Sequence, residues 1–141
     1  MSARSFFDTN VLVYTDAADA PAKRERALAL IEEHRRARTG VVSTQVLQEY
    51  FVAVTRKLGV DPAVARRKTE LFGRFDSVTP GLDDMLAAID LHRLHPLSFW
   101  DAMIVRAALS SGCSRLYSED LQHGWRIEGL EVVNPFGRGG G

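Results

Sequence analysis

Short runs of apolar residues alternate along the chain with longer segments in which apolar residues recur at helical spacing. The first run, residues 6–14, is almost entirely β-branched or aromatic and indicates a strand buried on both faces. Asp8 and Asn10 interrupt it, and a buried carboxylate without a partner is costly. Asp8 would lie just past a short Phe6-Phe7 strand. The alternative is an Asx-type turn formed by Asp8 and Asn10.

The rest of the chain continues the alternation of strands and helices. Further strands are predicted at residues 41–42, 77–79, 115–118 and 130–133. Helices are predicted at residues 21–38, 44–58, 82–94 and 99–111, with another beginning at Asp61-Pro62. This order favours an α/β fold in which a parallel sheet carries helices on both faces.

Helical spacing also predicts which side chains face the core. In the helices that begin near residues 21 and 61, Leu28 and Leu71 are assigned to the inner side. The helix at 82–94 is expected to bury four apolar side chains: Met85, Leu86, Ile89 and Leu94.

Composition limits the possible functions. A chain of 141 residues suffices for one domain, expected at residues 1–136, followed by a Gly-rich tail at 137–141 that we expect to be flexible. Lys plus Arg and Asp plus Glu both number 18, so the net charge is zero and a purely electrostatic nucleic-acid binder is disfavoured. Cys113 is the single cysteine, and no apolar run is long enough for a membrane span. We therefore expect a cytoplasmic protein.

Four acidic residues are the candidates for chemistry. Asp8 and Asp120 each follow a predicted strand, and ligands of parallel sheets bind beyond the carboxyl ends of strands. Glu49 and Asp101 lie on predicted helices. Two carboxylates about 4 Å apart repel by about 4 kcal/mol at an effective dielectric of 20, so four that converge would take up protons or bind a cation. Oxygen ligands favour Mg²⁺ or Mn²⁺, which can activate a water to attack a phosphodiester.

Simpler explanations compete with these assignments. Ser98 and Asp101 have the spacing of a capping box, so Asp101 could serve only to start a helix. Basic residues gather at 35–38 and 66–68 and could contact RNA phosphates. Charges at the end or on the face of a helix are more often simply solvated.

Taken together, five segments resemble the PIN-domain ribonucleases, and among them the VapC-type toxins of bacterial toxin–antitoxin pairs. The matching segments are residues 7–12, 43–49, 98–102, 118–121 and 133–136. Each segment is a weak signal alone, but all five in order at compatible spacing are fairly specific. The resemblance covers nearly the whole chain.

The resemblance implies a three-layer α/β/α sandwich with a central parallel sheet. It also implies Mg²⁺- or Mn²⁺-dependent cleavage of RNA, a homodimer, and a VapB-like antitoxin that occupies the active site. By position, the catalytic and metal-binding acids would be Asp8, Glu49, Asp101 and Asp120. The polar residues that support them would be Thr9, Asn10 and Ser118.

Two adjacent acids, Glu119 and Asp120, are candidates for the same position in the site. The family pattern places its acid two residues after a small hydroxyl residue, and Ser118 puts that position at Asp120. We therefore predict that Asp120 belongs to the metal site and that Glu119 is a flanking charge.

Two other functions compete with a ribonuclease. A haloacid-dehalogenase-like phosphatase also begins with an acid after its first strand, but it usually has a second Asp two residues later, where this chain has Asn10. The other alternative is a PIN fold without catalytic activity that acts as a binding module. The presence of all four acids argues against such a module.

Overall fold

A six-stranded sheet forms the centre of the protein in the computed structural model, which describes residues 3–137. The strands are β1 (Ser5–Phe7), β2 (Gly40–Ser43), β3 (Asp76–Val78), β4 (Arg115–Tyr117), β5 (Arg126–Ile127) and β6 (Leu130–Val133). Their order across the sheet is β3-β2-β1-β4-β6-β5, and all neighbours are parallel except β5 and β6. The predicted parallel sheet is confirmed.

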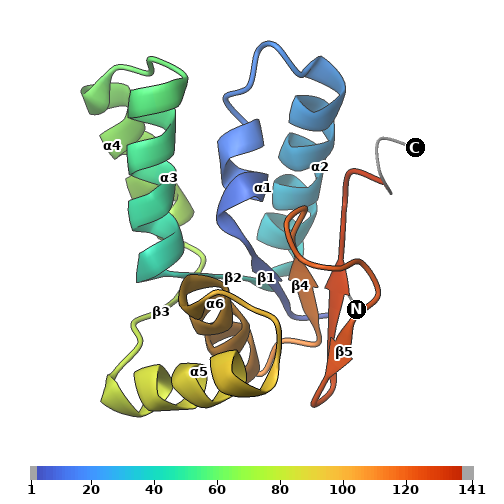
Figure 1. Cartoon of the computed structure of the whole chain (residues 1–141). Coiled ribbons are helices and arrows are strands. Elements are labelled where there is room, and N and C mark those ends of the chain that lie inside the picture. The colour runs from blue at the N-terminus through green and yellow to red at the C-terminus, as the bar shows by residue number, and fades with distance from the viewer. Residues whose placement is uncertain (1–2, 138–141) are drawn as a thin grey trace.

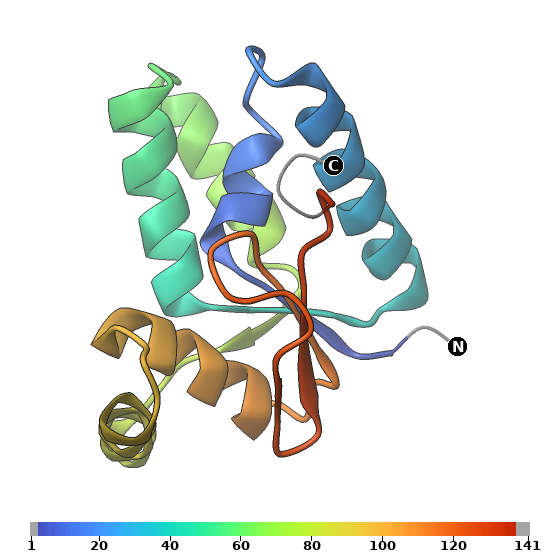
Figure 2. The same cartoon turned by 45° about the vertical axis from the view of Figure 1, so that its right-hand side comes forward.

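Helices cover both faces of this sheet, which gives the predicted α/β/α sandwich (Figure 1). They are α1 (Thr9–Tyr14), α2 (Pro21–Ala37), α3 (Thr44–Lys57), α4 (Pro62–Phe72), α5 (Leu82–Leu94) and α6 (Phe99–Ser110). The pair formed by α5 and α6 lies on one face and the other four helices lie on the opposite face, as the turned view in Figure 2 also shows. The α3–α4 pair lies beside α1, and α3 contacts both α1 and α4 (Figure 1).

The core holds β1 in place at the middle of the sheet. Phe6 and Phe7 are fully buried, and the Phe7 ring stacks on Tyr117 with centroids 5.9 Å apart. Any side chain at Gly40 would collide with the rings of Phe75 and Phe7, since an added Cβ would lie 2.7 and 2.9 Å from them. The strand that leads to Asp8 is therefore fixed on both sides.

The interpretation of residues 6–14 as a single buried strand is wrong after Phe7. Residues Thr9–Tyr14 form α1, although the segment is rich in β-branched and aromatic residues. The Asp8 side chain accepts a hydrogen bond from the Thr9 backbone N–H, and α1 buries Val11 and Leu12 between its neighbours. Tertiary packing outweighs the strand propensity of these residues.

Several predicted inner faces are also wrong. Leu28 and Leu71 are 45% and 40% exposed. On α5 the buried residues are Ala88 and Leu91. All four of the apolar residues expected inside this helix are exposed instead: Met85, Leu86, Ile89 and Leu94. The bounds of α5 were correct, but its most apolar stripe faces away from the core.

The C-terminal hairpin was not foreseen. Arg126 and Ile127 pair with β6 through a tight turn in which Glu128 and Gly129 both have positive φ, 48° and 87°. Such two-residue turns match the twist of a hairpin, so Gly129 was the available signal. Of the Gly-rich tail expected to be flexible, residues 138–141 lie outside the described part of the chain. Across residues 3–137, no helix is long and apolar enough to cross a membrane.

Candidate active site

Asp8 lies at the carboxyl end of β1 and is 4% exposed. One of its carboxylate oxygens accepts the Thr9 N–H at 2.7 Å, and the other accepts the Ser118 hydroxyl at 2.7 Å. Burial raises the pKa of Asp8 to about 7, although these two hydrogen bonds lower it and the charges of Asp120 and Asp101 raise it further. Asp8 is thus a local helix cap and also the most perturbed acid of the crevice.

Glu49 reaches the same place from α3. Its carboxylate accepts the Thr9 hydroxyl at 2.6 Å and the Gln45 side-chain amide at 3.3 Å. Gln45 also donates to the Trp100 carbonyl at 3.2 Å and so connects α3 to the start of α6. We did not predict a role for Gln45. Its position one helical turn before Glu49 was the signal that could have revealed it.

Asp120 lies in the loop after β4 and is exposed. The Asn10 side-chain amide donates to its carboxylate at 3.0 Å, and the Asp120 N–H donates to the Ser118 hydroxyl at 3.1 Å. Ser118 is fully buried, and its hydroxyl links the two acids because it donates to the Asp8 carboxylate and accepts the Asp120 backbone N–H. The three predicted supporting residues, Thr9, Asn10 and Ser118, each contact one or more of the acids.

Asp101 enters from the first turn of α6. Its N–H donates to the Ser98 hydroxyl at 3.1 Å, so the predicted cap at Ser98 is present. Burial raises the pKa of the Asp101 carboxyl, contact with Ser98 lowers it, and the charges of Asp120 and Glu49 raise it. Asp101 therefore lies near the charges of Asp120 and Glu49, a proximity that the capping alternative does not require.

These interactions bring the four acids to one crevice from four separate segments of the chain. The charges of Asp101 and Asp120 raise the pKa of Asp8, and the charges of Asp120 and Glu49 raise the pKa of Asp101. Asp101 and Asp120 also line one pocket of about 200 Å³. Like charges in a partly buried crevice favour a bound proton or a cation.

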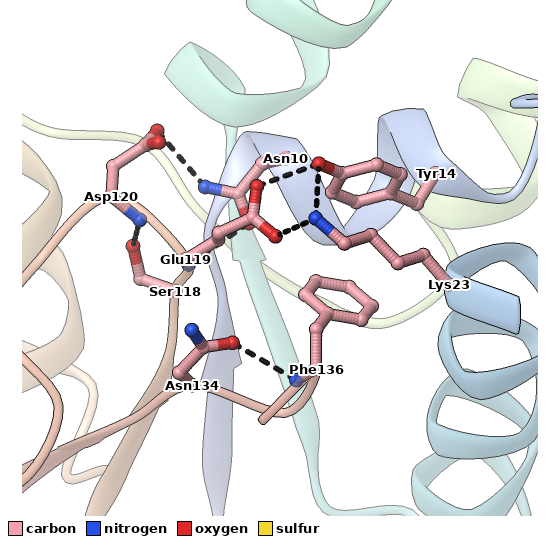
Figure 3. A network of polar contacts seen from close by, with 8 residues as sticks. All are labelled: Asn10, Tyr14, Lys23, Ser118, Glu119, Asp120, Asn134 and Phe136. Carbon is pink, nitrogen blue, oxygen red and sulfur yellow. Dashed lines mark hydrogen bonds and ion pairs between the residues drawn. The ribbon is translucent and has the colours of Figure 1, made fainter. Parts of the chain in front are cut away.

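The adjacent Glu119 points away from Asp120 and toward Tyr14 and Lys23, as Figure 3 shows. Its carboxylate accepts the Tyr14 hydroxyl at 2.6 Å and forms an ion pair with Lys23 at 2.6 Å. Burial would raise the pKa of Glu119, but the hydrogen bonds from Lys23 and Tyr14 outweigh it and the pKa is lowered. Its backbone N–H donates to Asn10 at 3.3 Å. The contacts of Glu119 with Lys23 and Tyr14 were not predicted. Both partners lie on helices that are distant from Glu119 in the sequence, so no short-range pattern indicates the contact.

The donor set of the crevice suits a hard cation. All four groups are carboxylates, and Asn10 and Thr9 hold two of them by hydrogen bonds. Within residues 3–137 no three His, Cys, Asp or Glu side chains already stand close enough to hold one ion together. The residue types and the mutual repulsion fit Mg²⁺ or Mn²⁺, and binding would require the carboxylates to draw closer.

The basic clusters considered as RNA contacts are mostly neutralised. Four of their six side chains pair with carboxylates: Arg35 and Arg36 with Glu32, Arg67 with Glu70, and Lys68 with Asp16. A pocket of about 660 Å³ lies at the amino ends of the strands beside Arg38 and Gly40 and contains none of the four acids. It is larger than the pocket beside Asp101 and Asp120, so pocket volume does not identify the candidate site, which we place at the acidic crevice.

The sequence matches the PIN domain family over residues 5–123. The chain belongs to the PIN domain family. This assignment disfavours the phosphatase alternative, and the PIN fold accounts for the acids at the carboxyl ends of β1 and β4. No curated protein is significantly similar in sequence.

Solved structures share the PIN fold of this chain. The toxin VapC20 of Mycobacterium tuberculosis, described as cleaving the sarcin-ricin loop, superposes with a TM-score of 0.64 at 22% identity, over 82% of this chain and 89% of VapC20. A toxin–antitoxin complex from Klebsiella pneumoniae gives a TM-score of 0.69 at 19% identity, over 93% of this chain and 97% of the matched chain. At these identities the likeness establishes the fold.

Proposed function

We propose that this PIN-domain protein is a metal-dependent endoribonuclease and the toxin of a toxin–antitoxin pair. The observation that carries the proposal is the convergence of Asp8, Glu49, Asp101 and Asp120, with the pKa of Asp8 raised to about 7 by burial and by neighbouring acids. The cleavage of the sarcin-ricin loop by VapC20, which shares the fold, supports RNA as the substrate class.

In this proposal Asp8, Asp101, Asp120 and Glu49 hold Mg²⁺ or Mn²⁺. A bound divalent ion would polarise the scissile phosphate and lower the pKa of a water ligand. Hydrogen bonds from neighbouring side chains orient three of these carboxylates. Ser118 donates to Asp8, Asn10 donates to Asp120, and Thr9 donates to Glu49. The raised pKa of Asp8 means that a cation must compete with a proton near neutral pH.

The decisive experiment is cleavage of RNA by the purified protein. We expect cleavage with Mg²⁺ or Mn²⁺ and none with a chelator, and a denatured preparation serves as the background. Full activity in chelator would refute metal dependence. Formation of a covalent aspartyl-phosphate at Asp8 would favour the phosphatase, and no cleavage of any RNA would favour a binding module.

An antitoxin partner is supported by the Klebsiella complex and by an apolar groove on the chain. The groove, about 430 Å³, lies between α3 and α4, with Leu47, Phe51 and Val52 among its walls. Glu49 lies on the same helix but does not line the groove, so a peptide bound there would have to continue around α3 to reach the acids. Expression alone should slow growth, and co-expression of the adjacent small gene should restore it. Harmless expression with all four acids intact would refute the toxin assignment.

A homodimer is the assembly that the exposed face of α5 favours. Leu82, Met85, Leu86 and Ile89 recur at spacings of three and four and are 65%, 40%, 51% and 41% exposed. Contiguous exposed apolar side chains of this kind mark interaction surfaces. Sedimentation should give a dimer that Leu86→Glu converts to a monomer, while the matched Val64→Glu on α4 leaves it intact. A monomeric native protein would refute the dimer. The cytoplasm remains the proposed location, in keeping with the single, buried Cys113.

A further inference from the structure

A small pocket beside the acids has walls that the proposed chemistry does not use. Asp101 and Asp120 form one side of its volume of about 200 Å³. Apart from Gln122, its other walls are apolar or aromatic and come from two loops, with His95 and Leu97 before α6 and Trp125 before β5. Whole small molecules occupy pockets of roughly 300–1,000 Å³, so this one is sized for a single planar group.

Hydrogen bonds hold the backbone that carries the Trp125 side chain. The Trp125 backbone N–H donates to the Gln122 carbonyl at 3.1 Å, and the Trp125 carbonyl accepts the Val132 backbone N–H at 2.9 Å. The His95 ring lies against the indole, edge to face, with centroids 5.4 Å apart. Trp125 is half-buried, which leaves part of the indole open to a ligand. An aromatic side chain that already packs against a second ring on a hydrogen-bonded backbone loses little conformational freedom on binding.

We propose that this pocket binds the nucleobase adjacent to the phosphate that is cleaved. The inference rests on the proposed function, since it takes the acids to be where the phosphodiester is held. A base stacked on Trp125 would be one nucleotide from Asp101 and Asp120, and every base has a face that an aromatic ring can stack on. The side-chain amide of Gln122, which also borders the pocket, can hydrogen-bond the edge of a base. Trp125 is then a substrate-binding residue that positions the RNA strand beside the acids.

An apolar side chain of a protein partner could also enter such a pocket. The position favours RNA, because a ligand here shares its wall with two acids that the proposal assigns to phosphate chemistry. The apolar groove between α3 and α4 is a separate surface that a peptide can use.

The test compares the effects of replacing each of the two tryptophans of the chain on RNA cleavage. Trp125→Leu should raise the KM for cleavage of a short RNA by roughly 10- to 100-fold, the equivalent of one lost stacking contact, with kcat changed far less. Trp125→Phe should recover most of the affinity because the ring is retained. Trp100→Leu is the matched control, since Trp100 is 61% exposed and is not part of the pocket. Circular dichroism verifies that each variant is folded.

A binding measurement keeps the inference independent of activity. In a Trp100→Phe protein, Trp125 is the single tryptophan, and its fluorescence should be quenched by a four-nucleotide RNA with phosphorothioate linkages. Unchanged fluorescence together with an unchanged KM for Trp125→Leu would overturn the inference. Equal effects of Trp100→Leu and Trp125→Leu on KM would also overturn it, as would loss of antitoxin binding with normal cleavage. If native protein cuts no RNA but Trp125 is still quenched, the base pocket stands and the proposed nuclease function fails.

Discussion

Glu119 and the neighbouring acidic cluster that contains Asp120 lie side by side in this protein but have opposite electrostatic environments. Glu119 is neutralised by Lys23 and Tyr14, which lower its pKa. The next residue, Asp120, lies near Asp8 and Asp101, and burial and the charges of neighbouring acids raise the pKa values of Asp8 and Asp101. A paired carboxylate contributes to folding, whereas clustered carboxylates oppose it unless a proton or a cation enters. The contrast separates a structural acid from candidate catalytic acids one residue apart.

The largest expected effect is the loss of activity in Asp101→Asn. This change keeps the shape and the Ser98 cap but removes one charge from the crevice. Cleavage should fall by about 100-fold or more, since metal-ion catalysis is worth several kcal/mol. Rates are measured with saturating Mn²⁺, and circular dichroism should be unchanged. Loss of activity that tracked unfolding would return Asp101 to a capping role.

The comparison itself is tested by the isosteric pair Asp120→Asn and Glu119→Gln. Asp120→Asn should require at least about tenfold more Mn²⁺ for half-maximal cleavage, because it removes a proposed ligand. Glu119→Gln should leave the metal requirement near normal, since its carboxylate points to Lys23. A Mn²⁺ titration of cleavage distinguishes them. The reverse ranking would move the role to Glu119, and equal large losses would assign both acids to the site.

Stability should depend on pH through Asp8. Its folded pKa of about 7 lies above the ordinary value of 3.8, so between about pH 4 and pH 7 the folded state binds more protons than the unfolded state. The free energy of unfolding in chelator should therefore fall as pH rises through this window, by about 1.4 kcal/mol per pKa unit of difference. Denaturant titrations of native protein and Asp8→Asn at pH 5 and pH 8 measure the change.

Asp8→Asn should flatten this pH dependence, and Asp19→Asn is the control, as Asp19 is an exposed acid before α2. A native protein that gains stability from pH 5 to pH 8 in chelator would contradict the raised pKa. Addition of Mg²⁺ or Mn²⁺ at pH 8 should restore stability to the native protein, because cation binding favours the folded state.

The smallest expected effect is that of Lys23→Met on stability. The ion pair with Glu119 is partly exposed, so its loss should cost about 0.5–1 kcal/mol of unfolding free energy in a denaturant titration. Glu119→Gln in the same background should cost little more, since the two residues share one interaction. Additive losses would show that the charge of Glu119 is stabilised by a group other than Lys23 and Tyr14, and would weaken its assignment as a purely structural acid.

The sequence by itself determined the class of fold and supplied the four candidate acids. Strand and helix periodicity located five of the six strands, and the helix α5 was placed with its bounds, because short-range periodicity reflects local burial. The positions of Asp8 and Asp120 after strands placed them at one edge of the sheet, since the carboxyl ends of parallel strands meet there.

Tertiary structure alone decided the rest. Residues 9–14 have strand propensity but form α1, because the acid before them caps a helix that packs between two others. The outward stripe of Leu86 and its neighbours could not be foreseen, since spacing shows that a helix has an apolar face but not what covers it. Only the fold brings Lys23 to Glu119 across 96 residues of sequence, and with it the difference between Glu119 and Asp120. Contacts between residues that are distant in the chain do not appear in the short-range periodicity of the sequence.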